Sequence, residues 1–203
     1  MGSSFSSPDP APTRPTGVSH IVVESEYPVH RFELYFGHGP DPRSVRLMPY
    51  NREAMYISYG YLGFTTYLLS PNGKIIMQFA RNWFSSRYTG ITNMNLIVPC
   101  EVSFDLDYPD CKVTASFQNW DRNRRKTTWV LCDPYRYGKE AEIKSHGRSI
   151  AKIKYSKEGC WPFNRHCYDI RVQAGFDDVL AIAMCIFWVR VFIPRSLLSH
   201  RST

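Results

Sequence analysis

The sequence lacks the motifs that most enzyme classes require. It holds no G-x-S-x-G, H-E-x-x-H, P-loop or dinucleotide fingerprint, and its six histidines are scattered without the spacing of metal ligands. The six cysteines form no C-x-x-C pair, and Asp105, Asp107 and Asp110 are more typical of a polar strand and turn than of a cation site. We therefore expect a protein that is not an enzyme, binds no metal or other cofactor, and keeps its thiols reduced in the cytoplasm.

A secretory signal is also missing, because no apolar run follows a basic start. Residues 1–17 are rich in Ser and Pro without periodicity, which predicts a disordered arm. The first six residues, Met1 to Ser6, fit the pattern for myristoylation of Gly2, although a Met-Gly-Ser-Ser start is also typical of an expression tag. A single acyl chain binds membranes only marginally and needs a second signal such as a basic patch.

The longest apolar run lies near the C-terminus, with eleven consecutive apolar residues from Val179 to Val189. Asp177 or Asp178 can cap a helix there and Pro194 can end it, which predicts a helix over about 177–193. A helix that is apolar on every face must be surrounded by protein or by lipid. A bilayer span needs about 20 apolar residues, so this shorter run favours burial in protein, with a C-terminal membrane anchor as the alternative.

Between Gly17 and this helix, about ten segments alternate apolar and polar residues with period two, the pattern of half-buried strands. Pro109-Asp110 predicts a hairpin turn between two of them. The residues expected to face inward are Phe32, Leu34, Phe36, Ile75, Met77, Phe79, Val102, Phe104, Leu106, Tyr108, Cys111, Val113, Ala115, Phe117, Ala151, Ile153, Tyr155, Tyr168, Ile170 and Val172. We predict a mainly β fold over residues 18–194, a closed antiparallel barrel that surrounds the hydrophobic C-terminal helix, followed by a basic tail at 195–203.

Three segments carry a resemblance to a known family. Residues 168–183 (YDIRVQAGFDDVLAIA) are similar to the C-terminal strand and helix of the tubby-like superfamily, in its LURP-one-related and phospholipid scramblase branches. Residues 147–153 and 68–76 resemble its glycine-led strand and its early hairpin. The resemblance implies a closed barrel around a hydrophobic helix. Scramblases carry an acidic, calcium-associated run before that helix, whereas this chain has only Asp177 and Asp178 there, so calcium-triggered scrambling is not expected.

Charge is the best guide to function. Residues 122–171 hold thirteen Lys or Arg against five Asp or Glu, a net charge of +8, while the whole chain carries +7. Such clustering favours an anionic partner, either lipid headgroups or nucleic acid, and a solvated basic face is the plain alternative. The candidate headgroup-binding residues are Arg122, Arg124, Arg125, Lys126, Lys152 and Lys154.

These features lead to one hypothesis and two alternatives. We expect a non-catalytic module that binds phosphoinositides or other anionic phospholipids at the periphery of a membrane, in the cytoplasm. The first alternative is a membrane-inserted, scramblase-like protein anchored by the helix at 177–193. The second is a nucleic-acid-associated protein that uses the basic region 122–171.

Overall fold

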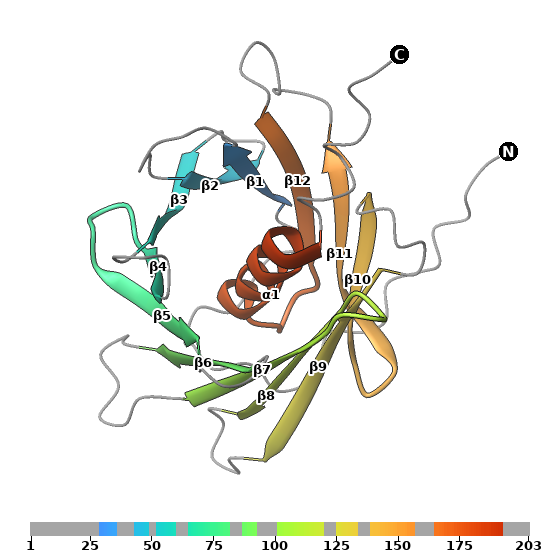
Figure 1. Ribbon diagram of the computed structural model, residues 1–203. Coiled ribbons are helices and arrows are strands. Elements are labelled where there is room, and N and C mark those ends of the chain that lie inside the picture. The colour runs from blue at the N-terminus through green and yellow to red at the C-terminus, as the bar shows by residue number, and fades with distance from the viewer. Residues whose placement is uncertain are drawn as a thin grey trace, which may run out of the picture.

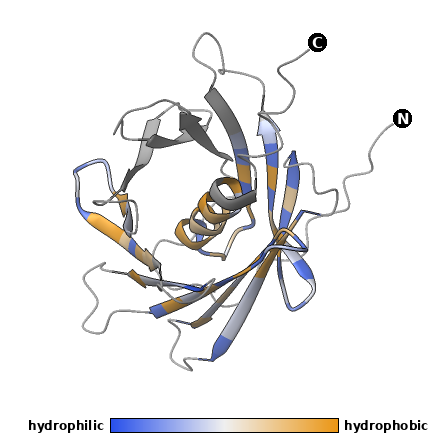
Figure 2. Cartoon of the chain, viewed as in Figure 1, coloured by the Kyte–Doolittle hydropathy of each residue, from blue (hydrophilic) through white to orange (hydrophobic). Residues whose placement is uncertain are grey.

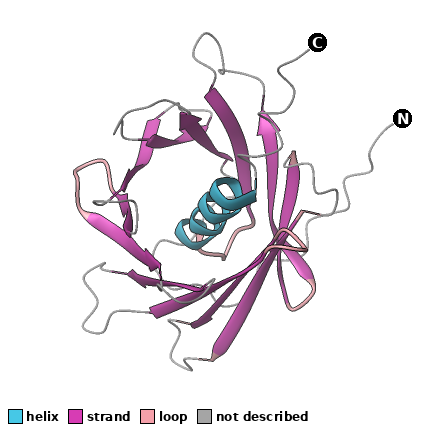
Figure 3. Ribbon diagram, viewed as in Figure 1, coloured by secondary structure: helices cyan, strands magenta, loops and turns pink. Residues whose placement is uncertain are grey.

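The computed structural model describes residues 29–35, 43–48, 52–59, 65–81, 87–92, 101–119, 125–133, 139–156 and 165–192. The expected arm at 1–17, the tail at 195–203 and Phe36 lie outside these residues. Within them the chain forms strands followed by one C-terminal helix, so the mainly β prediction is confirmed (Figure 3). The strands are β1 (Val29–Tyr35), β2 (Arg43–Met48), β3 (Arg52–Tyr59), β4 (Thr65–Leu69), β5 (Ile75–Arg81), β6 (Arg87–Thr92), β7 (Glu101–Asp107), β8 (Lys112–Gln118), β9 (Lys126–Cys132), β10 (Glu140–Ser145), β11 (Arg148–Ser156) and β12 (Arg165–Val172), and the helix is α1 (Asp178–Phe192).

Each strand pairs antiparallel with the strand before it and the strand after it in the chain. The ring of pairings closes because β1 pairs with β12 on one side and with β2 on the other. The result is a closed barrel with α1 along its middle (Figure 1). Closure leaves no long edge strand exposed, and it gives the apolar inner faces of the strands a common interior.

The helix fills that interior because it is apolar on every side (Figure 2). Every side chain from Val179 to Val189 is at most 3% exposed, which confirms that protein surrounds this part of the helix. Asp177 is the N-cap: its carboxylate Oδ1 accepts a hydrogen bond from the backbone N–H of Leu180 at 3.0 Å. Among the described residues, no helix is long and apolar enough to cross a membrane.

Side chains from opposite walls meet the helix in aromatic contacts. The ring of Phe187 lies 4.7 Å from that of Phe104 and 5.2 Å from that of Phe79, centroid to centroid. Trp188 contacts Tyr168 of β12 at 5.6 Å. The pairs with Phe79 and Tyr168 are edge-to-face and the pair with Phe104 is tilted, and because the three join α1 to β5, β7 and β12, they fix the helix relative to the wall.

Most of the predicted inward positions are buried, including Met77, Phe79 and the alternating apolar residues of β7, β8 and β12. Four of the expected inward positions are not fully buried, and one of them, Tyr155, is half-buried but still packs against the core. Tyr108 is 51% exposed and Cys111 is half-buried, because both belong to the turn between β7 and β8 rather than to the strands. Ile75 is half-buried while Ile76 is buried, because the register between β4 and β5 shifts at that point.

The order of the strands also decides which connections lie together. In a ring of antiparallel neighbours, successive connections alternate between the two ends of the barrel. The connections β4–β5, β8–β9 and β10–β11 therefore lie at the end where β12 leads into α1. We name this the N-cap end, after Asp177. The turn between β7 and β8 lies at the opposite end.

Candidate anionic-ligand site

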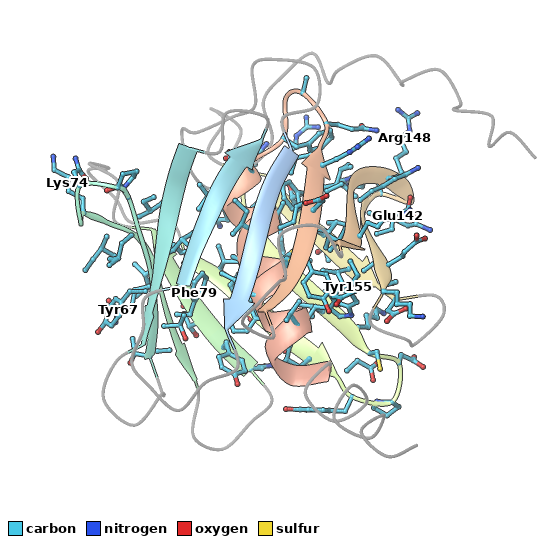
Figure 4. All side chains as sticks on the ribbon, turned by 90° about the horizontal axis from the view of Figure 1, so that it is seen from above. Tyr67, Lys74, Phe79, Glu142, Arg148 and Tyr155 are labelled. Atoms are coloured by element: carbon cyan, nitrogen blue, oxygen red, sulfur yellow. The ribbon has the colours of Figure 1, made fainter. Side chains whose placement is uncertain are left out.

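Four exposed cations mark the N-cap end of the barrel. Lys74 directly precedes β5, Arg125 precedes β9, Lys126 is the first residue of β9, and Arg148 is the first residue of β11. All three strands start at the N-cap end, so these residues belong to one rim although they are up to 74 positions apart in the chain. Lys74 and Arg148 project from opposite sides of the molecule at this same end (Figure 4). We name Lys74, Arg125, Lys126 and Arg148 the rim cations.

The rim cations are not neutralised by acidic neighbours that the structure describes. Within the described ranges, none of the four forms an ion pair. Among the side chains that the structure describes, the exposed acid at this end is Glu101, the first residue of β7, while Asp177 and Asp178 at the start of α1 are buried. Four cations against Glu101 leave a net charge of +3 on this described surface. The rim cations therefore give the N-cap end a positive potential that attracts anions.

Lys152 and Lys154 occupy a different surface, the outer wall of the barrel. Both are exposed on β11, and the register places Lys152 opposite Glu142 and Lys154 opposite Glu140. The ammonium of Lys154 lies 3.4 Å from a carboxylate oxygen of Glu140. On the other side of β11, Asp169 of β12 lies opposite Lys154. The two lysines are therefore interleaved with acids, which weakens the field that they present to a ligand.

Glu142 illustrates this compensation. Partial burial works to raise the pKa of Glu142, but hydrogen bonds from Ser149 and Lys144, and the charges of Lys144 and Lys152, outweigh it. The pKa therefore lies below its ordinary value, and the carboxylate is ionised at neutral pH. Lys144 lies 3.1 Å from the Glu142 carboxylate. Lys144 and Lys154 on this wall therefore already have a carboxylate partner within the protein.

The structure thus separates the predicted site residues into two groups. Arg125 and Lys126 lie on the rim, whereas Lys152 pairs through Glu142 with Cys132, six residues along β9 from Lys126. At about 3.3 Å per residue, that separation is about 20 Å. Three predicted residues, Arg122, Arg124 and the acylation candidate Gly2, lie outside the described residues.

Counting charges along the sequence did not place Lys74 and Arg148 in the same site as Arg125 and Lys126. Each directly follows a turn whose residue types are typical of turns: Pro71-Asn72-Gly73 before Lys74, and His146-Gly147 before Arg148. The alternation of ends in an up-and-down barrel then assigns both turns to the end of the β8–β9 connection. The signal was present in the turn positions rather than in the local charge density.

The acidic group near the β7–β8 hairpin has another role. Asp105 accepts a 2.7 Å hydrogen bond from Nε of Arg87 on the neighbouring strand β6, in an ion pair on the outer wall. No group of three His, Cys, Asp or Glu side chains with a geometry suited to a metal ion occurs within the described ranges. Asp105 therefore contributes to the pairing of β6 with β7.

Comparison with known proteins shows the family to which the chain belongs. A model of the LURP-one-related family matches residues 51–188, about two thirds of the chain. The chain belongs to the LURP-one-related family. The match runs from the start of β3 into the last turn of α1, so it contains all four rim cations of this LURP-one-related barrel. No curated protein and no solved structure shows significant similarity to the chain.

The LURP-one-related match is consistent with the tubby-like fold that the sequence resembles. It does not reach the scramblase branch, and that part of the resemblance stays a hypothesis. The fold alone does not decide what a LURP-one-related domain binds, because one fold hosts many functions.

Proposed function

We propose that this LURP-one-related protein is a non-catalytic module that binds anionic phospholipid headgroups, phosphoinositides among them, at the periphery of cytoplasmic membranes. One observation carries the proposal: four exposed cations, none in an ion pair with a described residue, share the N-cap end of the barrel. A cation near an anionic membrane surface contributes about 1 kcal/mol. The four rim cations together then favour anionic over neutral membranes by about 4 kcal/mol, or roughly a thousandfold.

Acylation of Gly2 would supplement this contact, because an acyl chain and a basic patch together anchor a protein far better than either alone. Lipid translocation is not part of the proposal. The part of α1 that a membrane anchor would have to expose is enclosed by the barrel, and the acidic run of scramblases is missing before it.

Vesicle flotation of the full-length protein, prepared without detergent, tests the proposal. We expect flotation with anionic vesicles at about 50 mM salt, its loss by about 200 mM, and no flotation with neutral vesicles. Equal flotation with both vesicle types would refute the proposal. Protein that resists extraction from membranes by carbonate would favour the membrane-inserted alternative instead.

A pair of charge-matched variants locates the contact. Arg125→Gln with Lys126→Gln removes two rim cations and should weaken binding to anionic vesicles about 30-fold. Lys152→Gln with Lys154→Gln removes the same charge from the outer wall and should weaken it less than threefold, because the acids opposite both lysines already screen them. The second variant also tests the sequence-based prediction that Lys152 and Lys154 contact headgroups.

Nucleic acid is the competing ligand for the same cations, and a competition experiment separates the two. Addition of a single-stranded oligonucleotide at matched salt should leave most of the protein on anionic vesicles. If the oligonucleotide strips the protein from the vesicles at equal phosphate concentration, the basic rim prefers nucleic acid and the lipid proposal is wrong.

A further inference from the structure

The hairpin between β4 and β5 forms an exposed tip on the same rim as Lys74. Its turn is closed by a hydrogen bond from the backbone N–H of Gly73 to the carbonyl oxygen of Ser70 at 2.9 Å. A second bond, from the N–H of Ser70 to the carbonyl oxygen of Lys74 at 2.8 Å, joins the two strands. Pro71 to Lys74 are exposed and Ser70 is half-buried. Gly73 has φ 79, a conformation that glycine adopts without strain.

The Ser70 hydroxyl is held only by groups of this turn. It accepts a hydrogen bond from the backbone N–H of Lys74 at 3.1 Å. Its single proton has two acceptors within reach, the carbonyl oxygen of Lys74 at 3.1 Å and Oδ1 of Asn72. None of these partners lies outside residues 70–74, so the tip can open without disturbing the barrel wall. Exposed tips of this composition are where modifying enzymes reach a folded chain.

The residue after Ser70 selects the kind of enzyme. Proline has no backbone N–H, so an enzyme pocket for it need not supply a hydrogen-bond acceptor. Protein kinases that require proline directly after the target serine use this difference to choose substrates. Among the described residues, Ser70 is the one serine or threonine that precedes a proline. The sequence holds one further such pair, Ser7-Pro8, outside the described residues.

We propose that Ser70 is a phosphorylation site for a proline-directed protein kinase, and that its phosphate weakens the contact of the N-cap end with anionic membranes; this regulation rests on the function proposed above. Ser70 Oγ forms a bond to the γ-phosphorus of a nucleoside triphosphate, and the bond from that phosphorus to the β-phosphate oxygen breaks. The nucleoside diphosphate leaves with that oxygen, and the hydroxyl proton passes to the base of the kinase.

The electrostatic consequence follows from the position of Ser70. A phosphoserine carries about −1.5 to −2 charges at neutral pH. Its oxygens would stand beside the Lys74 backbone N–H and within reach of the Lys74 ammonium, so they neutralise one rim cation and repel the membrane. The net charge of +3 on the described rim falls to about +1. We expect binding to anionic vesicles to weaken about 30-fold.

The first experiment tests the site directly. Full-length protein with Ser7→Ala is incubated with a proline-directed kinase and ATP, and phosphopeptides are mapped by mass spectrometry. We expect one phosphate on Ser70, none in Ser70→Ala, and none in Pro71→Ala, which keeps the hydroxyl but removes the proline. Absence of phosphate on Ser70, or equal phosphorylation of Pro71→Ala, would overturn the assignment.

The second experiment tests the regulation by flotation of phosphorylated and unphosphorylated protein with anionic vesicles. Ser70→Glu should weaken flotation in the same direction, whereas Pro109→Glu, at the opposite end of the barrel, should leave it nearly unchanged. Unchanged flotation of the phosphorylated protein would overturn the regulation. If the unphosphorylated protein fails to float, the proposed function is wrong and the regulation with it, while the mass spectrum still decides the site.

Discussion

At the scale of single residues, Gly90 of β6 shows how closely the wall packs around the helix. A Cβ atom added at this position would lie 2.9 Å from Cε2 of Phe104 and 3.2 Å from Cδ1 of Phe79. Both rings are fully buried against Phe187, so neither can move aside freely. We expect Gly90→Ala to lower the free energy of unfolding by about 1–3 kcal/mol, the usual cost of overpacking a core.

Urea unfolding of Gly90→Ala checks this prediction against a neighbour. Thr89→Ala changes the adjacent residue, which is half-buried on the outer face, and it should change stability by less than about 0.5 kcal/mol. Equal unfolding midpoints for the two variants would show that the rings of Phe79 and Phe104 can shift to accommodate the added methyl group, and would contradict the prediction.

The residue scale is also where sequence reasoning failed most clearly. Period two assigned the inner face correctly along β7 and β8, because those strands pair without interruption. It misassigned Ile75 and Ile76, because an irregularity in the β4–β5 register adds a residue that alternation alone does not reveal. Tyr108 continued the alternation of β7 in the sequence, yet the turn begins at that residue.

At the scale of elements, α1 depends on its buried cap. Asp177 accepts a hydrogen bond from Leu180 N–H, and its side chain is fully buried. Asp177→Ala removes the acceptor and should lower the free energy of unfolding by about 1–2 kcal/mol. Asp177→Asn keeps a side-chain oxygen at the same place and should cost less than half as much. Chemical unfolding of the two variants checks the cap, and equal losses would show that charge or packing, not capping, stabilises this position.

The pairing of β10 with β11 should make a small, pH-dependent contribution to stability. Because the pKa of Glu142 is lowered from 4.5 in the folded protein, its ionised form favours folding at pH values above 4.5. That contribution is lost as the pH falls through the lowered value. Glu142→Gln should therefore be less stable than the natural chain at pH 7, by less than about 1 kcal/mol, because water reaches the partly exposed Lys144–Glu142 pair and screens it. The difference in the free energy of unfolding between the two proteins, measured by urea unfolding, should vanish in acid. A difference that grows in acid would show that the ionised Glu142 carboxylate does not stabilise the fold.

The elements were more predictable than the site they build. The helix was expected over about 177–193 and is observed as Asp178–Phe192, since its run, its cap and Pro194 are all local signals. The rim joins Lys74, from the turn before β5, with the residues at the starts of β9 and β11, and their common end depends on how the strands are ordered around the ring. Charge counts along the chain grouped Arg125 with Lys152 instead, although the register sets them on different surfaces.

At the scale of the whole molecule, the match between two surfaces determines the architecture. A helix without a polar side can be buried only by something that surrounds it, and a sheet with one apolar face surrounds it by closing. In the part of the chain that the structure describes, the interior holds the protein's own buried side chains, so a ligand is expected at the rim or on the outer wall.

Cys185 lies in the middle of α1, so the reactivity of its thiol can show whether the helix stays enclosed by the barrel. Its thiol is fully buried in α1, and that burial raises the pKa of Cys185, so the reactive thiolate is disfavoured in the folded state. In a variant that keeps Cys185 as its single cysteine, we expect labelling by a thiol reagent to require opening of the whole barrel. The free energy obtained from the labelling rate should then equal the free energy of unfolding in urea. A matched variant that keeps only the half-buried Cys132 of β9 should react far faster under native conditions. Rapid labelling of Cys185 in the folded protein would show that the helix leaves the barrel without global unfolding, and would reopen the possibility that α1 meets a membrane.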